Sequence, residues 1–163
     1  MKNTKSGIEI EFTGITRTQA ANTVAAYFNS TVEGPFSHLN ERCIKDSEGR
    51  EWKIMSDSSI RAEKKANGRT APASEEYKVE LVTPIITYAH DLETLQELVR
   101  ALREAGAFTN DSAGIHCHVD GKGHTARTLR NFMNIASATT SFTKPSRLSR
   151  NASASAKSST SGW

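Results

Sequence analysis

The chain has 163 residues, of which 36% are hydrophobic and 24% are charged. This length fits one domain, since domains typically contain roughly 100–200 residues. The formal net charge of +3 arises at the C-terminal end, because residues 144–163 contain four basic residues and no acidic one. Residues 1–143 are nearly neutral, which argues against a nucleic-acid partner for the domain.

The sequence carries no signal for export or for membrane insertion. Its two cysteines, Cys43 and Cys117, lie far apart without CxxC spacing, which argues against a disulfide framework or a zinc cluster and fits a reducing compartment. No apolar signal region follows the N-terminus, and no apolar run reaches the roughly 20 residues of a membrane span. We therefore expect a cytoplasmic protein without a membrane partner. The sequence does not predict the oligomeric state.

The first third of the chain predicts one strand and one helix. Residues 6–13 alternate between apolar and polar, as in a strand. Residues 17–28 carry the apolar stripe of a helix, which Thr16 or Thr18 can cap. Residues 31–46 show no clear period.

The middle of the chain predicts a long antiparallel hairpin. Its strands are residues 51–60 and 76–86, and the second is rich in β-branched side chains. A polar loop over residues 61–75 would connect them. Trp52 in the first of these strands fits a core position better than an exposed stacking surface.

The last ordered part predicts two helices on either side of a strand. The clearest helix covers residues 91–105, with Asp91 as a possible cap and Gly106 as a stop. Residues 114–120 alternate as a strand, and a third helix begins near Thr125. The apolar side of that helix consists of Leu129, Phe132, Met133 and Ala136.

Composition divides the chain near residue 138. Residues 1–138 form the predicted folded domain, whereas residues 139–163 are a tail rich in Ser, Arg and Lys. Such a tail cannot bury enough apolar surface to offset its ordering entropy, so we expect it to be disordered. It is either a natural basic tail or, as we favour, the out-of-frame product of a frameshift or truncation. Resequencing the DNA past codon 138 distinguishes the two.

Acidic and imidazole side chains share faces of two predicted strands. Because successive side chains of a strand point to opposite faces, Glu9 and Glu11 lie on one face of the first strand. The same alternation groups His116, His118 and Asp120 on the later strand. Mg²⁺ and Mn²⁺ prefer carboxylate oxygens, so the two strands together predict a metal site. Taken alone, each strand also fits an ordinary solvated face.

The opposite faces of these strands are apolar. Cys117 is expected to be a small core residue there, not a nucleophile. The other residues expected to pack on this side are Ile8, Ile10, Phe12, Ile115 and Val119.

Other polar residues have two interpretations each. Glu80 lies in a strand built for burial, and it is either a metal ligand or one half of a salt bridge, with Lys78 or with a residue of a neighbouring strand. Asp57 is either a ligand or a turn former. The basic loop that contains Arg61 and Lys65 either faces water or closes over phosphate groups.

Four segments resemble motifs of the amidoligase family, whose members are carboxylate–amine ligases related to glutamine synthetase and glutamate–cysteine ligase. In chain order they are GIEIEF, WKIMSDSSI, EEYKVELVTPII and GIHCHVDG. The resemblance covers about residues 7–137. It implies an α+β fold with a mainly antiparallel sheet flanked by helices, similar to the glutamine synthetase catalytic fold. The concave face of that sheet would hold Mg²⁺ and ATP.

The resemblance also implies roles for individual residues. His118 would contact an ATP phosphate or a second ion, and Asp57 would bind a metal ion or the incoming amine, so these two are the expected catalytic residues. Arg61 and Lys65 are expected to help bind ATP because of the charge of their loop, and not because of the resemblance. The implied ligands of Mg²⁺, or of Mn²⁺, are Glu9, Glu11, Glu80 and His116.

The implied reaction joins a small-molecule or peptide carboxylate to an amine. ATP phosphorylates the carboxylate, and the amine attacks the resulting acyl phosphate. Related enzymes continue with further sequence that typically supplies an arginine for phosphate, and Arg147 and Arg150 in the tail are not expected to replace it. The alternatives are a non-catalytic nucleotide- or metal-binding remnant and a metal-dependent hydrolase.

Overall fold

The computed structural model describes residues 4–36, 38 and 40–143. The chain divides into two compact units, Met1–Gly121 and Lys122–Trp163. The first contains a mainly antiparallel sheet with two helices, and the described part of the second is a single helix. The α+β class predicted from the sequence is therefore confirmed.

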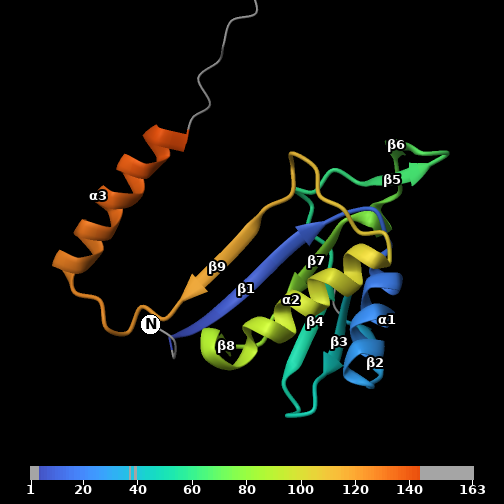
Figure 1. Cartoon of the computed structure of the whole chain (residues 1–163), viewed down its shortest axis with the longest axis horizontal. Coiled ribbons are helices and arrows are strands. Elements are labelled where there is room, and N and C mark those ends of the chain that lie inside the picture. Colours follow the sequence, from blue (N-terminus) through green and yellow to red (C-terminus); the bar gives the residue numbers. More distant parts are fainter. Residues whose placement is uncertain (1–3, 37, 39, 144–163) are drawn as a thin grey trace, which may run out of the picture. The chain divides into compact units, whose positions relative to one another are not determined.

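The main sheet has seven strands, and β1 lies inside it (Figure 1). Glu9 of β1 pairs with Val82 of β7 on one edge and with His116 of β9 on the other. Further along, β1 also pairs with β8, while β4, β3 and β2 extend the sheet beyond β7. The strands are β1 (Lys5–Phe12), β2 (Val32–Phe36), β3 (Glu41–Lys45), β4 (Glu51–Met55), β7 (Val79–Val82), β8 (Ile86–Thr87) and β9 (Ile115–Val119).

Two helices, α1 (Arg17–Phe28) and α2 (Tyr88–Glu104), pack against each other over one face of the sheet (Figure 1). The core beneath them is fully buried, and it includes Trp52 as expected from the sequence. The Trp52 indole N–H donates to Asp46 Oδ2 at 3.0 Å, so its polar atom is satisfied inside the core.

The helix boundaries follow local capping chemistry. Thr16 and Gln19 form a capping box, and α1 covers the residues predicted for it. In contrast, α2 begins three residues earlier than predicted, because Asp91 lies inside its first turn and Oδ2 accepts the Thr87 backbone N–H at 2.8 Å. Gly106 ends α2 with a φ of +106°, as expected.

The predicted hairpin is confirmed, since β4 and β7 pair antiparallel. The prediction that a polar loop without regular structure connects them was wrong. The loop contains a second hairpin, formed by β5 (Glu63–Ala66) and β6 (Arg69–Pro72), and a 3₁₀ helix, η1 (Glu75–Tyr77). Asn67 and Gly68 make its tight turn with φ angles of +52° and +74°, the geometry that Asn-Gly adopts readily.

The segment without a clear period forms β2 and β3. These strands pair antiparallel, but their register shifts between Glu33 and Phe36. This irregularity interrupts the two-residue alternation by which a strand is recognised in a sequence.

The prediction for the apolar face of β9 was wrong. Phe12 of β1 is buried, but Ile115 and Val119 are 66% and 64% exposed, and Cys117 is exposed as well. These side chains do lie opposite the histidines, as the alternation requires. However, the core beneath α1 and α2 includes no described residue of β9.

The second unit contains α3 (Ala126–Thr143). Thr125 precedes it, and its hydroxyl accepts the Thr128 backbone N–H at 3.3 Å, which confirms the predicted start. The boundary predicted at residue 138 falls inside this helix. The rest of the predicted tail, residues 144–163, lies outside the described residues. Within the described part of the chain, no helix is long and apolar enough to cross a membrane.

Candidate metal centre

The candidate site lies on the face of the sheet opposite α1 and α2. Glu9 and Glu11 alternate along β1 with the apolar residues of the core face. Glu11 pairs in register with Glu80 of β7, and Glu9 pairs with His116 of β9. Three adjacent strands therefore bring acidic and imidazole side chains together, as the sequence predicted.

Glu9 contacts both histidines of β9. Its Oε1 lies 3.0 Å from His118 Nε2, and its Oε2 lies 3.2 Å from His116 Nδ1. The hydrogen bond from His118 lowers the pKa of Glu9, assisted by His116 and opposed by burial. Glu9 is therefore a carboxylate at neutral pH.

Glu11 is 4% exposed and is fixed from the β9 side. Its Oε2 accepts the backbone N–H of Gly114 at 2.8 Å, and its Oε1 lies 3.8 Å from His116 Nδ1. This backbone hydrogen bond holds the Glu11 side chain toward the start of β9.

Glu80 is 8% exposed. Burial raises its pKa to about 7, and the negative charges of Glu9, Asp57 and Glu11 add to the shift. Neither salt bridge considered for it forms among the described residues, because Lys78 pairs with Glu75 at 3.0 Å and no residue of a neighbouring strand forms an ion pair with Glu80. The metal-ligand interpretation is therefore the one that the geometry favours.

Asp57 fits both of its interpretations. Its Oδ1 accepts the Ser59 backbone N–H at 2.6 Å, so it forms the turn that follows β4. Hydrogen bonds from Ser59 lower the pKa of Asp57. At the same time, its carboxylate lies beside those of Glu11 and Glu80.

These side chains form two overlapping groups. One contains Glu9, Glu80 and His116, and the other contains Glu11, Asp57 and Glu80. Within each group, one potential ligand atom per residue lies within 4.8 Å of the others, and Glu80 belongs to both. The two groups therefore overlap at one carboxylate, that of Glu80.

The donor set fits a hard divalent ion. Carboxylate oxygens with one imidazole suit Mg²⁺ or Mn²⁺. Among the ion pairs of the described residues, none joins a lysine or arginine to any of the four carboxylates. A divalent cation would neutralise carboxylates that form no ion pair with a lysine or arginine among the described residues.

Arg61 and Lys65, the two cations of the basic loop, lie away from the carboxylate cluster. Arg61 pairs with Glu63 at 3.0 Å and also with Asp111. Lys65 lines a cavity on the opposite face of the sheet, where its Nζ lies 5.7 Å from the centre of the Phe108 ring. The structure therefore does not bring either residue into the carboxylate cluster.

A hollow of about 530 Å³ adjoins the cluster. Glu9 lines the hollow and also belongs to one of the two groups, and His118, which contacts Glu9, lines the hollow beside it. Lys5 and Gly7 also line it, and sequence reasoning missed both, although they continue the same alternation as Glu9 along β1. Asp120, grouped with the histidines from the sequence, lies here too.

Arg17 is a second residue that sequence reasoning missed. It is 6% exposed at the start of α1, and its Nη1 donates to the carbonyl oxygens of Lys78, at 3.0 Å, and of Glu75. It also lies 3.4 Å from Ser56 Oγ. The two chain segments that it joins lead directly into Glu80 and Asp57. A basic residue in the first turn of a helix, where acids are favoured, is the sequence signal for such a role.

Comparison with known proteins places the chain in a family. A family model described as "Putative amidoligase enzyme" matches residues 2–147. No curated protein and no solved structure matches the chain. The family match includes all four motifs and the strands that carry the carboxylate cluster. The chain belongs to the amidoligase family.

Proposed function

We propose that this chain is a carboxylate–amine ligase that uses ATP and a divalent metal ion on a glutamine synthetase-like sheet. Membership of the amidoligase family supports ligase chemistry. The observation that carries the proposal is the convergence of four carboxylates and two imidazoles from β1, β7, β9 and the turn after β4. A cluster of this charge suits a reaction in which polyanionic phosphate must be held by metal ions.

The metal-binding residues follow from the two overlapping groups. Glu9 and His116 would hold one Mg²⁺ or Mn²⁺, Glu11 and Asp57 would hold a second, and Glu80 would contact both. When bound, these ions neutralise phosphate charge and orient the transferred phosphoryl group.

The chemistry needs an activated acid. The substrate carboxylate forms a bond to the γ-phosphorus of ATP, and ADP leaves. The amine then attacks the acyl carbon, inorganic phosphate leaves, and an amide remains. Asp57, whose pKa is lowered, stays anionic and suits an incoming ammonium group, while the exposed His118 beside Glu9 suits a phosphate oxygen.

The test asks whether phosphate release from ATP requires both a carboxylate and an amine substrate. The chain is incubated with ATP, Mg²⁺ and mixed amino acids, and phosphate release is followed together with the mass of any amide product. The proposal expects release only when a carboxylate and an amine are both present, and loss of that release in the Glu80→Gln variant. Release that needs water alone indicates a hydrolase, and ATP binding without turnover indicates a remnant.

A further inference from the structure

A second cavity lies on the helix side of the sheet, away from the carboxylate cluster. Its volume is about 540 Å³, within the range of small-molecule sites, roughly 300–1,000 Å³. Ile10 and Phe12 of β1 line it from the sheet, and they alternate with the two glutamates that face the other way. The remaining apolar lining comes from α2 and from the segment after it: Val99, Leu102, Ala107 and Phe108.

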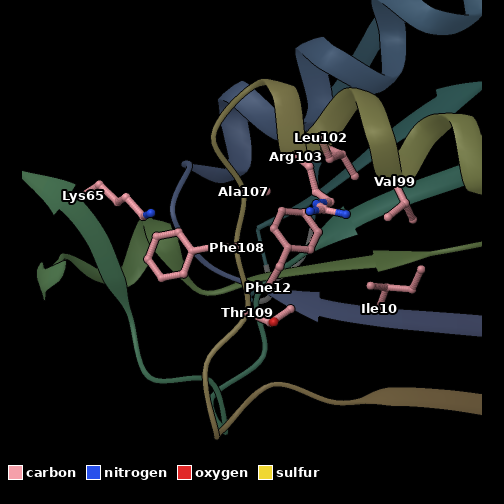
Figure 2. Close-up of a pocket in the computed structure, with 9 residues that line it drawn as sticks. All are labelled: Ile10, Phe12, Lys65, Val99, Leu102, Arg103, Ala107, Phe108 and Thr109. Atoms are coloured by element: carbon pink, nitrogen blue, oxygen red, sulfur yellow. The ribbon is translucent and has the colours of Figure 1, made fainter. Parts of the chain in front are cut away.

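Two basic side chains border this apolar surface, Lys65 from β5 and Arg103 from the last turn of α2 (Figure 2). Lys65 Nζ lies 5.7 Å from the centre of the Phe108 ring. Figure 2 shows Arg103 between Phe12 and Val99, so the cations approach the cavity from different elements.

The charge of the lining is unbalanced. No acidic residue lines the cavity, and within the described part of the chain neither Lys65 nor Arg103 forms an ion pair. Arg61, only four positions before Lys65, shows the contrast, because two carboxylates neutralise it. A ligand that brings an anionic group would complement both cations, and a guanidinium in particular matches a carboxylate.

We propose that this cavity binds a small carboxylate with an apolar body, at a site distinct from the metal centre. The apolar body would cover Ile10, Phe12 and Val99, and the carboxylate would lie toward Lys65 and Arg103. The lining offers no acid or imidazole for a metal ion. The proposal does not depend on the ligase function, because the two sites use opposite faces of β1.

The experiment compares decanoate with decanol, which share the apolar tail and differ in the anionic group. Binding to the full chain is followed by calorimetry and by amide chemical shifts, below the concentration at which decanoate forms micelles. We expect one saturable decanoate site, with shifts at Val99, Ala107 and Phe108, and at least tenfold weaker binding of decanol. Equal affinity for the two compounds, no binding, or shifts confined to other residues would overturn the proposal.

Matched variants test the two cations. Lys65→Ala and Arg103→Ala are each expected to weaken decanoate binding about tenfold, since a charged hydrogen bond is lost. The controls are Lys64→Ala on the same strand and Arg100→Ala on the same helix, neither of which lines the cavity. Equal losses in variants and controls would indicate non-specific attraction and overturn the proposal. Val99→Trp, which fills the cavity, should abolish binding while Mn²⁺ binding at the metal centre is retained.

Discussion

His116 lies directly opposite Glu9 across the β1–β9 pair, and its Nδ1 is 3.2 Å from Glu9 Oε2 although the residues are 107 positions apart in the sequence. His118 contacts the other oxygen of the same carboxylate at 3.0 Å. A carboxylate that fixes the ring orientation of a histidine is a common support for metal ligation. Glu9 is therefore placed to orient His116, and in the proposed metal centre it would also bind an ion.

Removing the charge of Glu9 or Glu11 should weaken metal binding without unfolding the chain. Glu9→Gln and Glu11→Gln are each expected to lower Mn²⁺ affinity at least about tenfold, measured by calorimetry. Glu51→Gln is the matched control, because Glu51 is an exposed carboxylate of the same sheet outside both groups. An unchanged Mn²⁺ affinity in both test variants would remove the metal assignment.

Metal affinity should depend on the ionisation of Glu80. Its pKa is raised to about 7, first by burial and then by the neighbouring carboxylates, whereas a bound ion requires the deprotonated form. Mn²⁺ affinity should therefore rise between about pH 6 and pH 8, and binding should release protons. Calorimetry in buffers of different ionisation enthalpy measures this release. An affinity that is flat across the range contradicts the prediction.

The same shift predicts that the metal-free protein loses stability as the pH rises. The folded-state pKa of Glu80 lies above its value of 4.5 in the unfolded chain, so the folded state binds more protons between the two. The free energy of unfolding therefore falls from about pH 4.5 to about pH 7, by up to about 3 kcal/mol. Glu80→Gln removes this loss. In urea denaturation with EDTA, the variant should exceed the parent in stability at pH 8 and match it near pH 4.5.

The sequence predicted the centre of the site because its signal is local. Alternation with a period of two places Glu9 beside Glu11, and His116 beside His118, whatever surrounds the strands. Alternation could not decide whether Glu80 is a metal ligand or half of a salt bridge. Its alternative partner, Lys78, is taken by Glu75 of η1, an element with no periodic signal of its own.

The burial of a strand side chain was harder to predict than the face of the sheet to which it points. Ile115 points away from the histidines as expected, yet it is exposed, because coverage depends on which helix reaches that strand. The β5–β6 hairpin is a different case. Its Asn67-Gly68 turn is a strong local signal, but short polar strands on either side lack the apolar alternation that marks a half-buried strand.

Asp91 should be important for stability, not for the site. It is 2% exposed in the first turn of α2, and its Oδ1 lies 2.7 Å from Arg50 Nη1. Burial opposes its ionisation, but hydrogen bonds from His90, Thr87 and Arg50 lower its pKa to about 2. Asp91→Asn is expected to cost about 3 kcal/mol at pH 7, because a buried pair is broken.

The control for this prediction is Asp111→Asn. Asp111 also pairs with an arginine, Arg61, but its side chain is 79% exposed, so its loss should cost less than about 1 kcal/mol. Because the folded pKa of Asp91 is depressed, its contribution is present above about pH 4 and disappears toward pH 2. Urea denaturation should therefore show the Asp91→Asn variant and the parent converging in acid. A constant difference across this range would mean that the loss comes from the altered hydrogen bonds of the amide and not from the missing charge.

Gly7 leaves space beside the metal centre. It shares the face of Glu9, pairs with His118 and lines the hollow of about 530 Å³. A Cβ at this position would lie 3.8 Å from the His118 Cβ, an ordinary contact, so the strand can accept a side chain. The proposed ligase has room here for its carboxylate or amine substrate. Gly7→Leu would fill that room.

We therefore expect Gly7→Leu to raise the KM of one substrate about tenfold or more, while Mn²⁺ affinity stays within about twofold of the parent. Gly7→Ala, which fills much less of the hollow, is the control and should change KM only slightly. A parent-like KM in Gly7→Leu would place the substrate elsewhere. A parallel loss of Mn²⁺ binding would mean instead that leucine displaces His118, and metal titration of the same variant separates the two outcomes.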